Sequence, residues 1–460
     1  METLFKLKEH KTNVQKEMVA GLTTFMAMAY ILAVNPSILS ATGMDSGAIF
    51  TATALASAIA SILMGLVANL PFALSAGMGL NAYFAYTVVI GMGASWQLAL
   101  AAVFTEGIIF ILLSLTNVRE AIFNSIPLTL KTAVSAGIGL FIVIIALINA
   151  HVIDGNPSTL VSLISIHTTL EQGTFQTIGI QAILCLIGII ITALLMYYKV
   201  NGSMLFGIFI TWFLGICCET AKIYVPNAEA GFFSTIPTQI ISLPQGISST
   251  LGQCFEGFAQ VQNGTVSIFS FVVICFAFLF VDIFDTLGTL IGCAHAGKML
   301  DDKGKLPGIK GALISDAVGT TVGAVLGTST ITTFVESASG IAAGGRTGLT
   351  AITTACLFLL ALFFSPLFLT IPSFATSPAL VMVGFLMMKN VVNIPWDDIT
   401  EAVPAFLSII AMPFFYSISE GISFGIISYV LINIAVGKIK KVNPILIVCA
   451  ILFVLKYIFI

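Results

Sequence analysis

A long series of apolar runs limits the fold of this chain, because about 20 consecutive apolar residues is the length of a helix that crosses a bilayer. Two sets of seven such runs lie on either side of a polar stretch at 220–264. The first set is 18–40, 47–69, 72–90, 95–116, 127–150, 176–197 and 202–219. The second is 265–293, 309–326, 328–343, 348–371, 376–389, 402–417 and 419–437. A last apolar stretch covers 443–460, and the sequence does not decide whether it crosses the membrane.

Composition agrees with an integral membrane protein. Only 8% of the 460 residues are charged and 58% are hydrophobic, whereas soluble domains carry about 25% charged residues. Long continuous runs indicate helices and exclude a transmembrane barrel, whose segments are short and alternate. The eight cysteines are scattered without a C-x-x-C pair, so neither a disulfide framework nor a metal site is predicted. The first 17 residues are polar, and no cleavable signal is expected.

The basic residues predict the orientation. With fourteen spans and the N-terminus inside, nearly all of the 18 Lys and Arg fall on the inner side, as the positive-inside rule requires. Lys222 falls outside, and the side of Lys456 depends on the stretch 443–460. We therefore expect a multi-pass protein of the cytoplasmic membrane with a cytoplasmic N-terminus.

Seven spans per set is an odd number, so the second set enters the membrane from the opposite side, which is the condition for an inverted repeat. The third run of each set is interrupted: FALSAGMGLNAYFAY (72–86) and TSTITTFVESASGIA (328–342) open with small or β-branched residues before a short helical pattern. Irregular backbone at membrane depth requires protein or a water-filled cavity around it. The pair therefore predicts a strand and a half-helix in each half, with a binding site between them. The alternative is two glycine-rich, tightly packed helices.

Acidic residues inside spans are costly and are candidates for function. Glu336 is expected in the first turn of the second half-helix, with Thr333 as its N-cap. Asp285 is favoured as a ligand because small and hydroxyl residues follow it, whereas Asp282 could be a structural acceptor at a helix seam. Asp316 is expected to be solvated or capping near the start of its span, and Glu106 to lie outside the site.

Two carboxylates beside half-helix N–H groups suit a small planar ligand that carries both donors and acceptors. Phe84 or Phe334 could cover a ring face, although 36 phenylalanines make packing the commoner role. None of the four histidines lies mid-span, so no histidine proton relay is predicted.

Four stretches carry a family resemblance: PFALSAGMGLNAYFAY, FVDIFDTLGTL, TTFVESASGIAAGGRTGLTA and TEAVPAFLSIIAMPFFYSISEGISFGIISY. They resemble the azaguanine-type (AzgA-like) branch of the nucleobase–ascorbate transporter superfamily, which comprises bacterial and fungal purine permeases. The resemblance extends over nearly the whole chain, and the run ES-A-G-AAGGRTGLTA is its most specific part.

The resemblance implies an all-α protein of about fourteen transmembrane segments in a seven-plus-seven inverted repeat. It implies a core domain, 1–116 and 265–371, that moves against a gate domain, 117–219 and 372–437. The connection 220–264 would be external, and 438–460 would form a C-terminal apolar stretch.

The resemblance also assigns site residues. The eighth-span acid before TLGTL is Asp285, and the tenth-span glutamate after TTFV is Glu336. The third-span Gly-x-Asn pattern matches Gly79 and Asn81. Thr289 stands where uracil-type relatives carry a histidine thought to assist proton coupling, so Asp285 or Glu336 is expected to carry the proton. Thr289 and Thr333 complete the predicted substrate-binding set.

The resulting prediction is a proton-coupled importer of purine bases, guanine and hypoxanthine before adenine or another nucleobase. No cofactor beyond the proton gradient and no nucleic-acid partner are expected, and a homodimer is left open. An anion transporter of the same fold is disfavoured by two acids in the site. An intramembrane aspartyl protease would need a Gly-x-Gly-Asp tetrapeptide, which the chain lacks.

Overall fold

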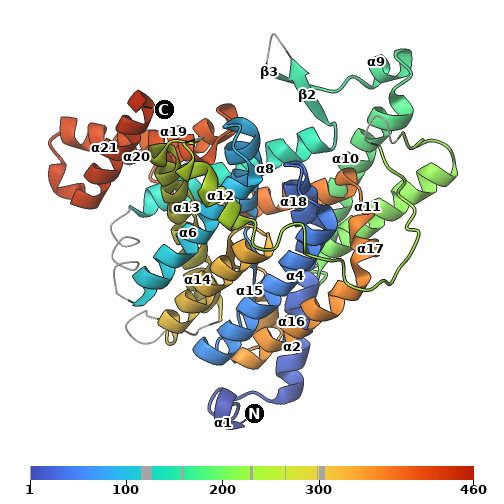
Figure 1. Ribbon diagram of the computed structural model, residues 1–460, viewed down its shortest axis with the longest axis horizontal. Coiled ribbons are helices and arrows are strands. Elements are labelled where there is room, and N and C mark those ends of the chain that lie inside the picture. The colour runs from blue at the N-terminus through green and yellow to red at the C-terminus, as the bar shows by residue number, and fades with distance from the viewer. Residues whose placement is uncertain are drawn as a thin grey trace.

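The computed structural model describes residues 2–115, 127–156, 160–227, 232–264, 266–297, 299 and 306–459. Within these residues the protein is mainly helical, with two small two-stranded sheets (Figure 1). Four basic residues that are predicted to lie on the inner side of the membrane are not among the described residues: Arg119, Lys298, Lys303 and Lys305.

All fourteen predicted segments are present. The first seven are α2 (Val14–Met28) with α3 (Ile31–Ser40); α4 (Ser46–Leu63) with η1 (Met64–Ala68); β1 (Leu74–Ala76) with α5 (Met78–Ala82) and η2 (Tyr83–Gly91); α6 (Trp96–Leu115); α8 (Leu128–Asn149); η3 (Phe175–Gly179) with α10 (Ile180–Tyr197); and α11 (Ser203–Thr220). The second seven are α13 (Ile268–Ala296); α14 (Ile309–Leu326); β4 (Ile331–Thr333) with α15 (Ser337–Ala342); α16 (Gly348–Ala361) with η5 (Leu362–Phe364) and α17 (Ser365–Leu369); α18 (Ser373–Met388) with η6 (Lys389–Asn393); α19 (Ile399–Phe414); and α20 (Ile418–Ala435).

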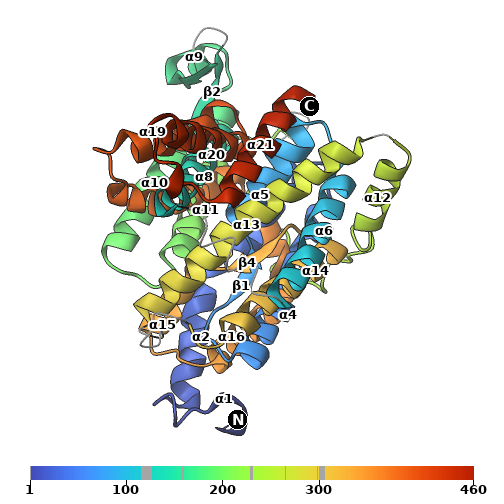
Figure 2. The same ribbon diagram turned by 90° about the vertical axis from the view of Figure 1, so that its left-hand side faces the viewer.

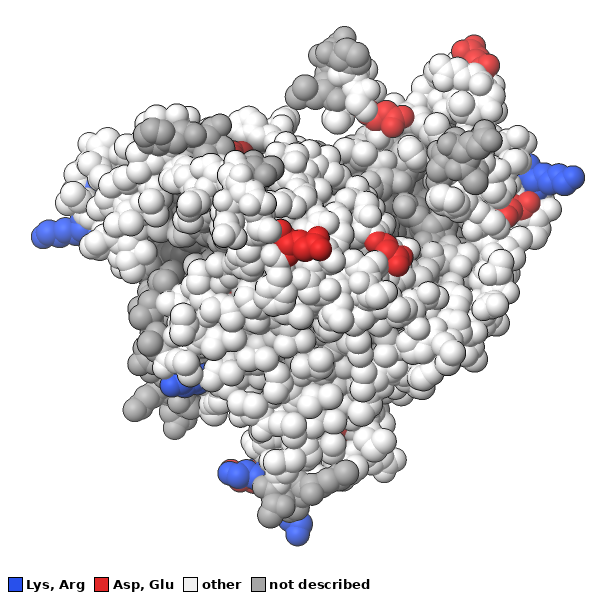
Figure 3. Space-filling model, viewed as in Figure 1, with Lys and Arg blue, Asp and Glu red and all other residues white. Residues whose placement is uncertain are grey.

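The remaining elements lie before, between and after these segments. They are α1 (Glu2–Phe5), β2 (Ile153–Asn156), β3 (Leu160–Leu163), α9 (Ile166–Glu171), α12 (Cys254–Gln262), η7 (Ile439–Lys441) and α21 (Pro444–Phe459). Among the described residues, ten helices are long and apolar enough to cross a membrane. Most of the face in Figure 3 carries no charged side chain, as expected for a surface that meets lipid.

The two interrupted segments pair with each other. β1 and β4 form an antiparallel sheet in which Ser75 lies opposite Thr332, and Figure 2 places both strands in the middle of the molecule. Equal strands related in this way have a local two-fold axis, which makes Leu74 and Ile331 equivalent positions. This confirms the predicted strand and half-helix in each half of the chain and excludes two continuous helices.

Hydroxyl groups satisfy the outer edges of this sheet. Ser61 Oγ on α4 accepts from Leu74 N at 3.0 Å and donates to Leu74 O at 3.3 Å. Thr320 Oγ1 on α14 does the same for Ile331, accepting from its N at 3.2 Å and donating to its O at 3.0 Å. α4 and α14 are the second segments of their sets, so the two contacts are related by the inverted repeat. Irregular backbone persists here because protein replaces water as its partner.

The helices pack in two groups. α16 contacts both α2 and α4, and α6 contacts α13 and α14 around the strands. In the other group α8 contacts α18 and α19, α10 and α11 contact α18, and α20 contacts α19. The paired strands therefore lie inside the first group.

The run GGRTGLTA, which is the most specific part of the family resemblance, bonds the start of α16 to α2. The buried Glu17 accepts from Arg346 N at 3.0 Å, from Thr347 N at 3.2 Å and from Thr350 Oγ1 at 2.6 Å. A carboxylate at a helix N-terminus stabilises the helix through its free N–H groups. This run anchors two segments to each other and, among the described residues, forms no hydrogen bond or ion pair with the carboxylates of Asp285 and Glu336.

Candidate functional site

Two carboxylates lie beside the paired strands. Asp285 on α13 accepts from Thr332 Oγ1 at 3.2 Å, and Glu336 accepts from Tyr30 OH at 2.6 Å. Both side chains are partly buried, and both lie at β4, since Asp285 is bonded to Thr332 of this strand and Glu336 follows its last residue, Thr333, by three positions. Segments one, eight and ten therefore meet at one position, as the two predicted ligands require.

Segment three contributes its backbone at the same position. A Cβ on Gly77 would lie 2.8 Å from Thr332 Oγ1 and 3.2 Å from Asp285 Oδ2. Only glycine allows the chain to pass this close to the carboxylate. Gly77 N also donates to Thr330 O at 3.0 Å, which continues the strand pairing by one residue.

The start of the second half-helix differs from the prediction. α15 begins at Ser337, so Glu336 occupies the N-cap position rather than the first turn, and its side chain does not cap the helix. The predicted capping role of Thr333 is wrong, because a turn closed by Ser337 N and Phe334 O (3.1 Å) separates strand from helix. Thr333 Oγ1 is instead buried on β4 without a hydrogen-bond partner among the described residues.

Asn81 lies on α5 and is fully buried. Its Oδ1 accepts from Ser329 Oγ, whereas its Nδ2 has no hydrogen-bond partner in the described part of the chain. A buried amide with unused N–H groups is costly unless a ligand accepts from it. This unused donor is the strongest local sign of a polar ligand.

The other two predicted residues lie nearby in different roles. Gly79 faces α8, where its Cβ would be 2.8 Å from Ile138 Cγ2, so in this conformation it permits close helix packing. Thr289 is buried on α13, one turn after Asp285. Phe84 packs edge-on against Phe278 with ring centroids 6.5 Å apart, and Phe334 is buried.

The expectation that Asp316 is solvated or capping is wrong. Asp316 and Asp282 are both fully buried, and Thr286 Oγ1 lies 2.8 Å from Asp282 Oδ1 and 2.9 Å from Asp316 Oδ1. α14 begins seven residues before Asp316, at Ile309, which carries this side chain two turns into the bundle. Asp282 thus lies at the seam of α13 and α14, which is the structural alternative for this residue.

Several residues at the site were not predicted from the sequence. Tyr30 lies in the break between α2 and α3, within a run that looked like one continuous span. Ser329 and Thr332 are hydroxyl residues of the interrupted segment that pair with Asn81 and Asp285. Glu106, which was expected to lie outside the site, is fully buried on α6 and accepts from Thr330 Oγ1 of the interrupted segment at 2.9 Å. No sequence spacing connects these residues, because each contact joins different segments.

Paired interrupted segments, with two carboxylates beside them in a bundle of fourteen apolar segments, define a membrane permease of the inverted-repeat class. The chain belongs to the nucleobase–ascorbate transporter family, since the model described as "Permease family" matches residues 15–424. It is a multi-pass nucleobase permease and not an enzyme.

Similar proteins agree with this assignment. The chain is 44% identical to the guanine/hypoxanthine permease PbuG of Bacillus subtilis (strain 168), over 100% of both proteins. It is 39% identical to the adenine permease AdeP of Escherichia coli (strain K12), over 100% of this chain and 96% of that protein. The transmembrane domain of the cyanobacterial bicarbonate transporter BicA has the same fold, with a TM-score of 0.63 at 15% identity over 90% of this chain and 97% of that one.

Proposed function

We propose that this permease imports purine bases, guanine and hypoxanthine in preference to adenine, by proton symport. The observation that carries the preference is Asn81. Its oxygen already accepts from Ser329, whereas its amide hydrogens are unused, so the group that it offers to a ligand is a donor. Guanine and hypoxanthine carry a carbonyl oxygen on the six-membered ring where adenine carries an amino donor. A site that donates therefore favours the carbonyl bases.

The two carboxylates complement the rest of such a base. Ring N–H and amino groups donate, and Asp285 and Glu336 accept. The names of the relatives support purines as the class, since PbuG is a guanine/hypoxanthine permease and AdeP an adenine permease.

The proposed proton carrier is Asp285. Thr289 cannot take up a proton near neutral pH, so the proton needs a carboxylate. Tyr30 OH donates to Glu336 at 2.6 Å. Thr332 Oγ1 donates to Asp285 at the longer distance of 3.2 Å. A proton on Asp285 thus disturbs a longer and weaker hydrogen bond, and Glu336 serves mainly to hold the base.

Transport would follow from movement of one helix group against the other. The group around β1 and β4 corresponds to the proposed core domain, and α8, α10, α11, α18, α19 and α20 to the proposed gate. The contact of Gly79 with Ile138 of α8 is one place where the groups meet beside the site. With the N-terminus in the cytoplasm, rocking at this boundary would expose the base to either side in turn.

The substrate preference is tested by competition in cells that express the chain. Uptake of labelled hypoxanthine is measured with unlabelled guanine, hypoxanthine and adenine as competitors. We expect Asn81→Ala to lower the affinity for guanine and hypoxanthine by about tenfold, since leaving a buried partner unpaired costs about 1–3 kcal/mol, and to spare adenine. An unchanged ranking with normal uptake would assign Asn81 to packing instead.

Proton coupling is tested in proteoliposomes. Asp285→Asn mimics the protonated carboxyl, so it should exchange purine across the membrane in counterflow yet fail to accumulate it under an imposed pH gradient. Asp397→Asn, an exposed carboxylate outside the site, is the control and should behave as the wild type. Accumulation by Asp285→Asn equal to that of the wild type would refute the assignment.

A further inference from the structure

A cavity lies where η2 meets the turn between α19 and α20. It encloses about 200 Å³ and is lined by Tyr83 and Thr87 of η2, by Tyr416 and Ser417 of the turn, and by Glu420 of α20. Thr87 lies six residues after Asn81 on the helix Met78–Gly91, so the two side chains are about 9 Å apart along the axis at 1.5 Å per residue. Val273, which also lines the cavity, lies twelve residues before Asp285 on α13 and so about 18 Å from it along the helix axis. The cavity is thus separate from the position of Asp285.

The walls of this cavity carry unused and fixed polar groups. Thr87 is 6% exposed, and its hydroxyl has no partner among the described residues. Tyr457 OH donates to Glu420, which holds the carboxylate in place. Tyr416 has a left-handed backbone with φ of 53°, and its ring packs edge-on to Tyr86 with centroids 6.1 Å apart. This left-handed residue directly follows Phe415, the C-cap of α19, and ends that helix.

We propose that this cavity is a second binding position for the transported base, occupied before or after the position at Asp285 and Glu336. The ligand class is a planar heterocycle with a ring N–H that donates to Glu420 and an acceptor for the Thr87 hydroxyl, beside aromatic side chains that cover its face. This inference rests on the proposed function, because the same base must reach both positions.

The test measures hypoxanthine binding to the purified full chain in nanodiscs. In Glu336→Gln, with the first position disabled, we expect a weaker saturable binding to remain and to be lost in Glu336→Gln/Thr87→Val. The matched control is Glu336→Gln/Thr23→Val, because Thr23 is also buried and its hydroxyl bonds Val19 O at 2.9 Å within its own helix.

The outcomes separate the two proposals. Absence of residual binding in Glu336→Gln, or residual binding that survives Thr87→Val, overturns the second position while purine uptake by the wild type stands. A wild-type chain that neither binds nor transports purines overturns the proposed function itself.

A different observation concerns α21. This helix runs back along α20: Tyr457 near its end bonds Glu420 in the first turn of α20, and the Tyr457 ring lies 6.2 Å from that of Phe424. The short connection 436–443 joins the end of α20 to the start of α21. Phe453, between the two ends, packs on Phe276 of α13 with ring centroids 5.6 Å apart. α21 therefore extends over the full depth of α20.

We infer that α21 is a fifteenth membrane-spanning helix. It has 16 residues, as α19 does, and its outward side chains are apolar, such as Val448 at 56% and Ile451 at 53% exposed. Because α20 is the fourteenth segment, residues beyond α21 emerge on the side opposite the N-terminal residues. The stretch 443–460 would then complete the membrane part of the gate.

Epitope tags on the two sides of α21 test this topology. One tag is inserted after Gly437, whose φ of +76° and open surroundings mark an unpacked turn, and the other is added after Ile460. In spheroplasts of cells that retain purine uptake, we expect antibody to reach the tag after Ile460 and to reach the tag after Gly437 only when the membrane is permeabilised. Tags that are accessible on the same side would overturn the inference.

Discussion

At the scale of single residues, Tyr30 is the partner on which the position of Glu336 depends. The phenol lies in the break of the first segment and donates to the carboxylate at 2.6 Å. A hydrogen bond to a charged group contributes about 1.5–3 kcal/mol. We expect Tyr30→Phe to raise the KM for hypoxanthine roughly tenfold or more, since each 1.4 kcal/mol is a factor of ten, at unchanged expression.

Concentration-dependent uptake measures this change. Tyr198→Phe is the control, because Tyr198 is 72% exposed and far from the site in the fold. A KM for Tyr30→Phe equal to that of the wild type would show that Glu336 is positioned by the β4–α15 backbone alone.

At the scale of elements, the paired strands depend on two hydroxyl groups. Ser61 and Thr320 each bond both backbone groups of one strand residue. Removing either hydroxyl leaves a buried N–H and C=O unpaired, at a cost of about 1–3 kcal/mol per group. Ser61→Ala and Thr320→Val should therefore lower the melting temperature in detergent by similar amounts, because the positions are related by the repeat. Thr23→Val, whose hydroxyl bonds its own helix, should change it little; equal melting temperatures throughout would contradict this account.

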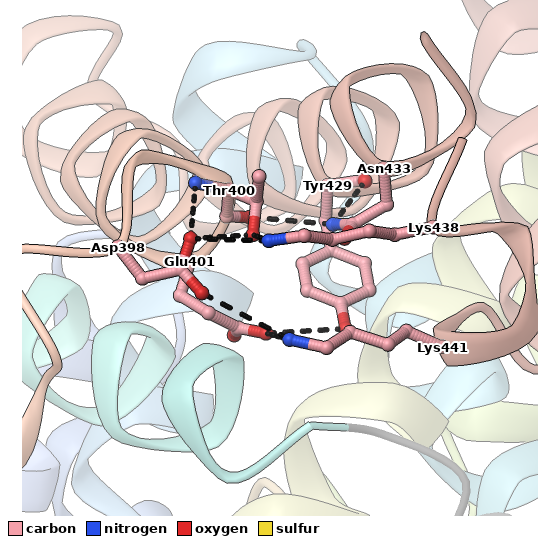
Figure 4. Close-up of polar contacts among 7 residues, drawn as sticks. All are labelled: Asp398, Thr400, Glu401, Tyr429, Asn433, Lys438 and Lys441. Carbon is pink, nitrogen blue, oxygen red and sulfur yellow. Dashed lines mark hydrogen bonds and ion pairs between the residues drawn. The ribbon is translucent and has the colours of Figure 1, made fainter. Parts of the chain in front are cut away.

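The hairpin of α19 and α20 is closed by a charged cluster at the start of α19 (Figure 4). Asp398 caps α19 by accepting from Thr400 Oγ1 at 2.7 Å and Thr400 N at 3.0 Å. Lys438 Nζ and Lys441 Nζ lie 3.6 Å and 3.9 Å from its carboxylate. The bonds from the Thr400 hydroxyl and N–H, and then the two lysines, hold the pKa of Asp398 below its usual range.

A lowered pKa gives a defined pH dependence. The carboxylate contributes stability above the unfolded pKa of about 3.9, and that contribution is lost as pH falls through the lower folded value. Asp398→Asn keeps a capping oxygen but no charge, so it should melt below the wild type at pH 7. The difference should shrink once the pH falls below about 4. Asp397→Asn is the neighbouring control, and a difference that does not depend on pH would show that the charge is irrelevant.

At the scale of the whole molecule, Gly79 sets how closely the two helix groups approach. Its Cβ would overlap Ile138 Cγ2 at 2.8 Å, a distance that the branched and buried isoleucine cannot relieve by rotating its far end. Gly79→Ala should therefore hold α8 away from α5 and lower the Vmax of hypoxanthine uptake severalfold. Ile138→Ala in the same chain removes the clashing methyl group and should restore part of the rate. Failure of this second change to restore transport would place Gly79 in contact with the substrate instead.

The sequence by itself determined the membrane class, the fourteen segments and the two interruptions, because these follow from local properties. Run length and hydrophobicity decide whether a helix crosses a bilayer, and clustered β-branched residues and glycines lower the local helix propensity. Glu336 and Asp285 could be singled out for the same reason, since a charge inside an apolar run is visible without a structure.

The tertiary structure alone decided the partners of those residues. Tyr30 meets Glu336 across 306 positions of chain, and Ser329 meets Asn81 across 248, separations that carry no periodic signal. Asp316 looked solvated because it is near the start of its run, yet it is fully buried two turns into α14 and accepts from Thr286 of α13. Hydrogen bonds between segments depend on how the helices pack against one another, and that packing follows from the shapes of all the segments together rather than from any one of them.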